Sequence, residues 1–213
     1  ELVNDPKVDL AVVCTPDKTH LEIAAAFMRA GKAVLLEKPM SNREQECIDI
    51  EAAAAKAGKH MAVCHVLRYT PFYQTIKGII DSGEIGQVMV ASQIENVAYW
   101  HQAHSFVRGN WHVAADTTPM ILAKCCHDMD ILAWLIGKKC KKVQSFGSLS
   151  YFKESNAPEG SPLYCIDGCP ATDCPYNAVK LYYDNKDNSW FRRSSTKKVE
   201  PTDEDVELAL RTT

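Results

Sequence analysis

The sequence predicts an α/β protein in which part of a doubly wound parallel sheet is followed by a second, α+β domain. Three observations lead to this fold class. Strand-like and helix-like segments alternate over the first 65 residues, which is typical of a parallel sheet. The pattern changes after Arg68-Tyr69, where longer strands and helices follow each other without that alternation. The chain is 213 residues long, 46% hydrophobic and 24% charged, so it can bury a core of ordinary globular size.

The first strand is expected at Asp9–Cys14, because this short apolar run suits a strand covered on both faces. A helix is expected over His20–Arg29, where apolar residues recur with helical spacing. Gly31 follows it and can adopt the left-handed conformation that ends many helices. The apolar run Ala33–Leu36 then predicts the second strand.

A second helix is expected between this strand and a third one. Ser41-Asn42-Arg43-Glu44 has the spacing of a capping box, which would satisfy free backbone amides at the start of a helix. The alanine-rich stretch after it favours a helix as far as Gly58. Met61–His65 is the third expected strand. Residues 1–66 are therefore assigned to the first domain.

Residues 67–213 are assigned to the second domain. Proline and glycine mark the ends of its first two helices. Its expected elements, in chain order, are a helix from Pro71 to about Ile80, a strand at Val88–Ile94, a polar and aromatic loop from Asn96 to Asp116, a helix from Pro119 to Ile136 closed by Gly137, a strand at Lys142–Tyr151, and a short acidic helix from Thr202.

Charge and hydropathy restrict the partners of the chain. With 24 basic and 27 acidic side chains the formal charge is −3, which gives no electrostatic basis for binding nucleic acid or an anionic membrane. No apolar run is long enough to span a bilayer, and the first residues do not resemble a signal peptide. We expect a cytoplasmic protein that binds a small neutral or polar molecule.

Glu37-Lys38-Pro39 places an amine at the carboxyl end of the strand Ala33–Leu36. Open α/β sheets bind their ligands at that end, and Pro39 stops the strand because it has no amide donor. Taken alone, Lys38 is better explained as a surface lysine that extends into solvent. Two other motifs in the chain favour a role in binding or chemistry.

The three motifs, in this order and at this spacing, resemble those of the Gfo/Idh/MocA oxidoreductase family. They are Val12-Val13-Cys14-Thr15-Pro16-Asp17-Lys18-Thr19-His20, Gly31-Lys32-Ala33-Val34-Leu35-Leu36-Glu37-Lys38-Pro39 and His127-Asp128-Met129-Asp130. The resemblance covers the chain from about Asp9 to Tyr151. It implies a Rossmann domain for NAD or NADP, joined to a domain with an open, largely antiparallel sheet. It also implies oxidation of a secondary alcohol on a sugar, polyol or related molecule, or reduction of the ketone.

The resemblance further implies which residues contact the cofactor and substrate. Thr15, Pro16 and His20 would border the cofactor, and Glu37 and Lys38 would flank the nicotinamide ribose. Lys38 would also reach the reacting hydroxyl, where an ammonium can polarise a carbonyl or stabilise an alkoxide.

His127 is the proton carrier that the resemblance implies, and an imidazole that titrates near neutral pH suits this task. The alternative is a structural helix histidine capped by Asp128 or Asp130. Many relatives have an aspartate four residues before this histidine, whereas this chain has Ala123 there, followed by Lys124. Lys124 can share a helix face with His127, so it is a secondary catalytic candidate. Two cations beside the substrate would suit a carboxylate or a strongly polarised carbonyl.

The loop Tyr99–His112 concentrates aromatic, histidine and arginine side chains of the kind that line substrate pockets. His104, Arg108 and Trp111 are its candidate substrate contacts. Metal binding through His101, His104 and His112 is the alternative reading, although the loop contributes no acidic ligand. For Arg68-Tyr69 a domain-interface role and a cofactor role both stay open.

The chain has nine cysteines, and most are expected to be reduced thiols. Cys165, Cys169 and Cys174 lie close together in a proline-rich segment and are candidates for a structural zinc site, completed by Cys140, Asp167 or Asp173. A proline-rich loop of reduced thiols, or an adventitious disulfide, is the simpler explanation of these three cysteines.

No G-x-G-x-x-G motif occurs in the sequence, although such a motif receives the pyrophosphate in dinucleotide-binding domains. We therefore expect an internal fragment of a longer oxidoreductase that by itself binds dinucleotide weakly or not at all and is inactive. Sheet edges left without partners favour self-association, so a homo-oligomer formed through the sheet of the second domain is expected. The alternative functions are a non-catalytic protein-binding or dimerisation domain and a cysteine-metal interaction module.

Overall fold

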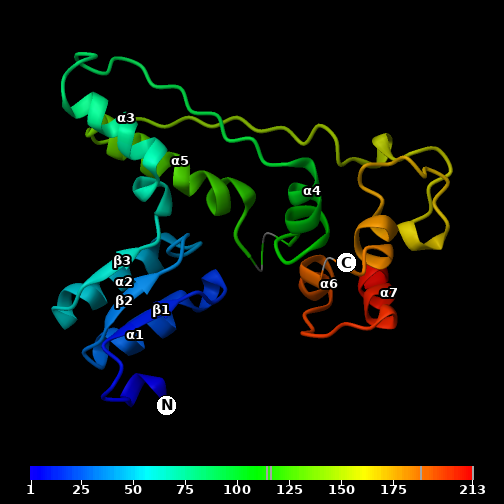
Figure 1. The fold of residues 1–213 in the computed structure, drawn as a ribbon, viewed down its shortest axis with the longest axis horizontal. Helices are drawn as coiled ribbons and strands as arrows, with labels where there is room; N and C mark the ends of the chain where they lie inside the picture. The colour runs from blue at the N-terminus through cyan, green and yellow to red at the C-terminus, as the bar shows by residue number, and fades with distance from the viewer. Residues whose placement is uncertain (114, 116, 188, 213) are drawn as a thin grey trace. The chain divides into compact units, whose positions relative to one another are not determined.

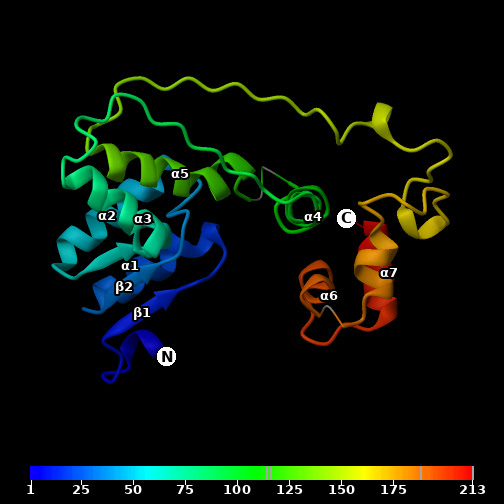
Figure 2. The same ribbon diagram turned by 45° about the horizontal axis from the view of Figure 1, so that its top comes forward.

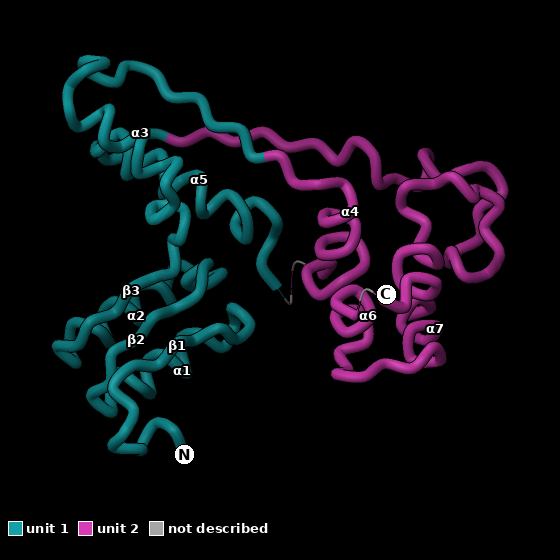
Figure 3. Tube along the Cα trace, viewed as in Figure 1, with its two compact units in different colours: residues 1–95, 117–142 teal, residues 96–116, 143–213 magenta. Residues whose placement is uncertain are grey.

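The structure is a computed structural model that describes residues 1–213 with the exception of 114, 116, 188 and 213. The chain forms two compact units (Figure 3). Unit 1 consists of Glu1–Glu95 and Thr117–Lys142, and unit 2 consists of Asn96–Asp116 and Val143–Thr213. Each unit contains an apolar cluster of its own. None of the described helices is long and apolar enough to cross a lipid bilayer.

Unit 1 contains a parallel sheet in the strand order β1-β2-β3 (Figure 1). Its strands are β1 (Leu10–Val13), β2 (Ala33–Leu36) and β3 (Met61–Val63). In the register of the sheet, Val13 lies beside Leu36 and Leu36 lies beside Val63, so the three strands end together. The three strands predicted from the sequence are confirmed, each within two residues of its expected ends.

Two helices, α1 (His20–Arg29) and α2 (Glu44–Ala57), pack on the sheet and on each other. The buried core between helices and sheet consists of Ala11, Val13, Ala24, Met28, Val34, Leu36 and Ile50. Leu10 and Val12 on the other face of β1 are 51% and 59% exposed. The expectation that this strand is covered on both faces is therefore wrong for the described residues, because both crossover helices lie against the same face.

The start of α2 also differs from the prediction. The helix begins at Glu44, and no side chain caps it. The hydroxyl of Ser41 instead donates to Oε2 of Glu46 at 2.6 Å, and it accepts a hydrogen bond from the amide of Arg43 at 3.1 Å. A turn stabilised by Ser41 thus replaces the expected capping box. Gly58 ends the helix in the left-handed conformation, with φ of 60°.

Two further helices complete unit 1, α3 (Pro71–Asp81) and α5 (Met120–Ile136). Both were predicted from the sequence, and Gly137 closes α5 with φ of 66°, as expected. Two 3₁₀ turns, Asp17–Thr19 and Val66–Tyr69, follow β1 and β3 respectively. They shape the chain where it leaves the sheet.

The antiparallel sheet expected in the second domain is not formed by the described residues. Residues 88–94 and 142–151 are extended but belong to no sheet. Their apolar side chains are open to solvent, and Val90, Val143 and Phe146 are 83–88% exposed. The two strands predicted at Val88–Ile94 and Lys142–Tyr151 are therefore not formed in the described residues, because a strand needs a neighbour that takes up its backbone hydrogen bonds.

Unit 2 is helical in its described part (Figures 1 and 2). Its elements are α4 (Tyr99–Gln102), a π-helical turn at Ala103–Arg108, 3₁₀ turns at Glu154–Asn156 and Cys165–Asp167, a second π-helical turn at Val179–Asp184, α6 (Ser189–Thr196) and α7 (Asp203–Thr212). The acidic helix from Thr202 is confirmed as α7. The expected loop 96–116 is largely helical instead, and its residues 114 and 116 lie outside the described residues. The buried cluster of unit 2 is Ala178, Tyr182, Phe191, Val206 and Leu210.

Candidate active site

The three parallel strands deliver polar side chains to one edge of the sheet. Thr15 follows β1, Glu37 and Lys38 follow β2, and His65 follows β3. Because the register aligns the carboxyl ends of the strands, these residues come to the same edge. This is the edge at which open parallel sheets bind ligands.

His20 ties two of the strand-end segments together. Its ring is fully buried. Nε2 lies 2.9 Å from the carbonyl oxygen of Thr15, and Nδ1 lies 3.1 Å from that of Pro39 and 3.2 Å from that of Met40. Both ring nitrogens are thus engaged by the backbone. His20 holds the segments after β1 and β2 in place.

Lys38 extends from the end of β2 to helix α5. Its ammonium Nζ donates a hydrogen bond to the carbonyl oxygen of Ala123 at 3.0 Å. The backbone amide of Lys38 donates to Oε2 of Glu37 at 3.1 Å, so this carboxylate bends back toward the chain that carries it. The amine that the sequence placed at a strand end is therefore held against α5 rather than extended into solvent.

The beginning of α5 is fixed to the same strand ends. The fully buried Thr118 donates from its hydroxyl to the carboxylate of Asp17, in the turn after β1. Asn42, after β2, donates from Nδ2 to the carbonyl oxygen of Thr117 at 3.4 Å. These contacts determine which face of α5 meets the edge of the sheet.

That face carries Lys124 and His127, the two candidates that the sequence placed on this helix. Burial lowers the pKa of the Lys124 ammonium, and the nearby charge of Lys38 lowers it further, while Glu95 acts in the opposite direction. Burial also lowers the pKa of the His127 imidazole below its ordinary value of 6.5, with Lys38 and His65 adding to the effect. The structure thus brings Lys38, Lys124 and His127 together.

Sequence reasoning missed a second histidine beside His127. The rings of His65 and His127 meet edge to face, with their centroids 6.0 Å apart and their planes at 81°. The signal was present, because His65 ends the third expected strand and must therefore lie at the same edge as Lys38. No earlier motif pointed to it.

Arg68 has a definite partner in the structure. It donates from Nε and Nη2 to the two carboxylate oxygens of Asp130 on α5, at 2.7 and 2.5 Å. Asp128 accepts from Nε2 of Gln93 at 3.0 Å. The carboxylates suggested as caps for His127 are therefore engaged elsewhere, and Nδ1 of His127 is buried with no hydrogen-bond partner.

The candidate substrate contacts of the loop Tyr99–His112 belong to unit 2. His104 is 3% exposed, with Nδ1 2.7 Å from the Tyr182 hydroxyl and Nε2 3.0 Å from the Ser194 hydroxyl. Its pKa is lowered to about 4, mainly by burial. Arg108 donates to the carbonyl oxygen of Tyr176, and Trp111 is 37% exposed. His104 is thus placed as a core histidine of unit 2.

Neither expected metal site is present among the described residues, which contain no group of three side chains able to hold a metal ion. All nine cysteines are free thiols. Cys165 packs against the apolar cluster of unit 2. The zinc site proposed for Cys165, Cys169 and Cys174 is therefore not supported, and the same holds for a site made by His101, His104 and His112.

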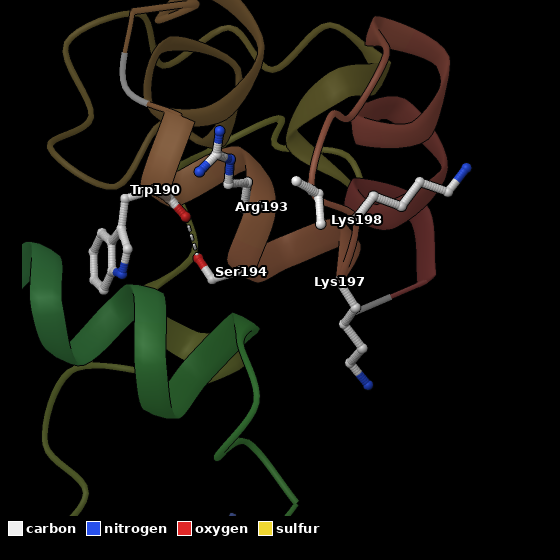
Figure 4. A pocket seen from close by; sticks show the side chains of 6 residues that line it. Trp190, Arg193, Ser194, Lys197 and Lys198 are labelled. Atoms are coloured by element: carbon white, nitrogen blue, oxygen red, sulfur yellow. Dashed lines mark hydrogen bonds between the residues drawn. The ribbon is translucent and has the colours of Figure 1, made fainter. Parts of the chain in front are cut away.

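Unit 2 has a hollow of about 390 Å³ beside helix α6 (Figure 4). Its lining residues are Trp190, Arg193, Ser194, Lys197, Lys198 and Val199. Two of the polar groups already have protein partners: Ser194 donates to the carbonyl oxygen of Trp190 at 2.6 Å, and Lys198 is 2.6 Å from Asp205. The titratable side chains at the carboxyl ends of the parallel strands lie in unit 1 instead.

Comparison with known proteins assigns most of the chain to one family. Residues 1–65 match the family model of an oxidoreductase family with an NAD-binding Rossmann fold, and residues 73–165 match the GFO/IDH/MocA C-terminal domain. Inositol 2-dehydrogenase 2 of Saccharopolyspora erythraea is 32% identical over 139 residues, which cover 65% of this chain and 38% of the relative. Inositol 2-dehydrogenase/D-chiro-inositol 3-dehydrogenase of Lactiplantibacillus plantarum is 29% identical over 147 residues, which cover 68% and 39%.

A solved structure shares the fold. The apo scyllo-inositol dehydrogenase from Lactobacillus casei aligns with a TM-score of 0.53 and 21% identity, over 65% of this chain and 38% of that one. The chain spans about two fifths of the length of the curated relatives it matches.

Proposed function

Because this chain belongs to the Gfo/Idh/MocA family of NAD-binding oxidoreductases, we propose that it serves hydride transfer between NAD or NADP and a secondary alcohol or ketone. A polyol or sugar-like substrate is supported by the inositol dehydrogenases among its relatives. The observation that carries the proposal is the hydrogen bond from Lys38 to Ala123, one helical turn before His127 on the same face of α5.

The carboxyl edge of the sheet has side chains that fit a dinucleotide. Thr15 and Pro16 are exposed, and Glu37 and Lys38 are partly exposed, so all four are open to a ligand. We assign them the contacts with the cofactor, whose nicotinamide accepts or supplies the hydride when bound. His20 is fully buried, so its part is to hold the segments after β1 and β2 in the shape that the cofactor requires.

Lys38 is proposed to orient and polarise the reacting oxygen. An ammonium has three donors, and one of them is directed at Ala123. The others can bind the hydroxyl or carbonyl oxygen of the substrate and stabilise negative charge that develops there. The fixed ammonium needs little reorganisation when the substrate binds.

His127 is proposed to carry the proton. Its lowered pKa keeps the imidazole neutral near neutral pH, so it can accept the hydroxyl proton during oxidation and return it during reduction. Lys124, whose pKa is also lowered, is the secondary candidate for contact with the substrate. Arg108 and Trp111 are proposed as further substrate contacts, with His104 fixing the loop that carries them.

We assign residues 1–66 to the dinucleotide-binding domain and residues 67–213 to a substrate and oligomerisation domain. A second role, in self-association, is favoured by the exposed apolar side chains of the extended segments 88–94 and 142–151. Paired with the same segments of another copy, they would form the antiparallel sheet and lose their exposed edges.

The proposed chemistry is tested by supplying NAD or NADP together with a panel of inositols, hexoses and other polyols and following reduced nicotinamide. Dinucleotide must be present at high concentration, because the sequence contains no G-x-G-x-x-G motif. Oxidation of at least one polyol that is lost in Lys38→Met would support the proposal, and it would overturn the expectation that the chain by itself is inactive. The proposal fails if dinucleotide binds but no polyol is oxidised and no corresponding ketone is reduced.

A further inference from the structure

His65 is a partly buried histidine, with 27% of its side chain exposed, that the proposed chemistry does not use. It lies two residues after the end of β3, at the same edge of the sheet as Lys38. Its ring faces that of His127 edge to face, with 6.0 Å between the centroids. Two imidazoles at this distance cannot both be charged without repelling each other.

The pair of rings has an anchor on one side. Nδ1 of His65 lies 3.9 Å from Oδ2 of Asp130, whose side chain is only 10% exposed. The same carboxylate is held by both arms of Arg68. A bidentate guanidinium fixes the plane of a carboxylate, so Asp130 presents its charge to His65 in one orientation.

Burial is the largest cause of the lowered pKa of His127, and its charged neighbours modify that effect. Nδ1 of His127 and Nδ1 of His65 are both buried without a hydrogen-bond partner. Charged and titratable groups face His127 from three elements. Lys38 after β2 and His65 after β3 disfavour its protonation, while Asp128 and Asp130 on its own helix favour it. Among these groups, His65 and Asp130 act on His127 in opposite directions and lie 3.9 Å from each other.

We propose that His65 is a positioning residue that forms one titrating pair with His127, with Asp130 and Arg68 anchoring the pair. His65 need not touch the substrate. It adjusts the pH at which His127 takes up a proton, while the fixed Asp130 carboxylate acts on both rings through its charge. The proposal deepens the proposed function, because it assumes that His127 carries the proton.

The test is an NMR titration of the protein labelled in its histidine rings, with the His127 resonance assigned by its loss in His127→Gln. In His65→Phe the ring contact is kept but the like charge is removed, so the pKa of His127 should rise. In Asp130→Asn the favourable charge is lost and Arg68 is no longer neutralised, so the pKa of His127 should fall. His60→Phe is the matched control, because His60 is exposed at the opposite end of β3, and it should leave His127 unchanged.

Opposite shifts in the two variants would not follow from a general loosening of the fold. An unchanged His127 titration in His65→Phe, or a shift of the same sign in both variants, would overturn the proposal. If a variant does not fold, the wild-type protein decides the question: coupled rings titrate in curves with two inflections, whereas two independent single-step curves contradict the pair.

The titration requires neither cofactor nor substrate, so it separates the two proposals. If His127 responds to His65→Phe but hydride transfer survives in His127→Gln, the histidine pair is real and the proposed proton carrier is wrong. If hydride transfer depends on His127 but the pKa of His127 is the same in His65→Phe as in the wild type, the proposed function stands and the proposed pair of histidines is refuted.

Discussion

The ammonium nitrogen of Lys38 lies 3.0 Å from the carbonyl oxygen of Ala123, to which it donates a hydrogen bond. This contact joins the end of β2 to the first turns of α5 and sets the amine beside the helix face that carries His127. The acceptor is a backbone carbonyl, and the charge of Lys38 contributes to the lowered pKa of both Lys124 and His127.

Introducing the missing carboxylate should shift the titration of His127. In Ala123→Asp an anion would stand one turn before His127, and a nearby negative charge favours the protonated imidazole. The lowered pKa of His127 should therefore rise, and with it the acidic limb of the pH profile for alcohol oxidation. Ile121→Asp is the control, because residue 121 on the same helix is 60% exposed. Equal shifts in both variants would contradict the local effect described here.

Removing Arg68 should destabilise unit 1. In Arg68→Met the Asp130 carboxylate, 10% exposed, loses both arms of the guanidinium. Because Arg68 itself is 37% exposed, we expect a loss of about 1–3 kcal/mol in the free energy of unfolding rather than the larger cost of breaking a fully buried pair. Lys77→Met is matched to it, since Lys77 also lies over the Trp134 ring but pairs with the more exposed Asp81.

The Lys77 variant should cost less than about 0.5 kcal/mol. Urea unfolding followed by circular dichroism measures both values. Equal losses in the two variants would mean that the Arg68–Asp130 pair contributes no more than a surface ion pair.

Unit 2 should lose stability in acid through His104. Its pKa in the folded chain is about 4, against an ordinary value of 6.5. The unfolded chain therefore takes up the proton first, and stability present above about pH 6.5 is lost as the pH falls toward 4, by at most ~3 kcal/mol. Trp190 lies 4.6 Å from His104 between ring centroids, so tryptophan fluorescence can follow the unfolding.

In His104→Gln the free energy of unfolding should depend less steeply on pH across this range, whereas the exposed His60→Gln should keep the wild-type slope. If the free energy of unfolding of His104→Gln depends on pH as steeply as that of the wild type, groups other than His104 cause the loss of stability in acid.

Self-association should depend on the extended segments 88–94 and 142–151. Val90 and Phe146 are 87% and 88% exposed, and burying such side chains against another copy would favour an oligomer. Light scattering coupled to size exclusion should give an oligomer for the wild type and a smaller species for Val90→Lys combined with Phe146→Lys. A stable wild-type monomer would refute this proposal.

The parallel half of the fold could be predicted from local signals. Ala33–Leu36 is a continuous apolar run of strand length. Gly58 and Gly137 end helices at positions where the backbone adopts the left-handed conformation, which glycine adopts readily. The beginning of α2 was missed because the Ser41 hydroxyl has two possible partners, and the Glu46 side chain competes successfully with the helix amides. Sequence spacing alone cannot decide such a competition.

The candidate site was predicted only in part. Lys38 and His127 belong to motifs, so the sequence could name them, but contacts between the strand ends and α5 bring them together. His65 and Asp130 lie 65 residues apart in the sequence but close together in the structure. A local sequence pattern cannot predict such a contact. In unit 2 the aromatic loop was read as a pocket, but Tyr182 and Ser194, far along the chain, enclose His104. Composition alone does not distinguish a binding loop from a core.

The most direct test of the account compares wild type, Lys38→Met, His127→Gln and the double variant in polyol oxidation at saturating dinucleotide, with folding checked by circular dichroism. If Lys38 and His127 act on the same oxygen, each single variant should lose roughly 100-fold or more in kcat/KM. The double variant should lose far less than the product of the two, because residues that act as a unit are not additive. Wild-type kcat/KM in either folded single variant would contradict the central claim.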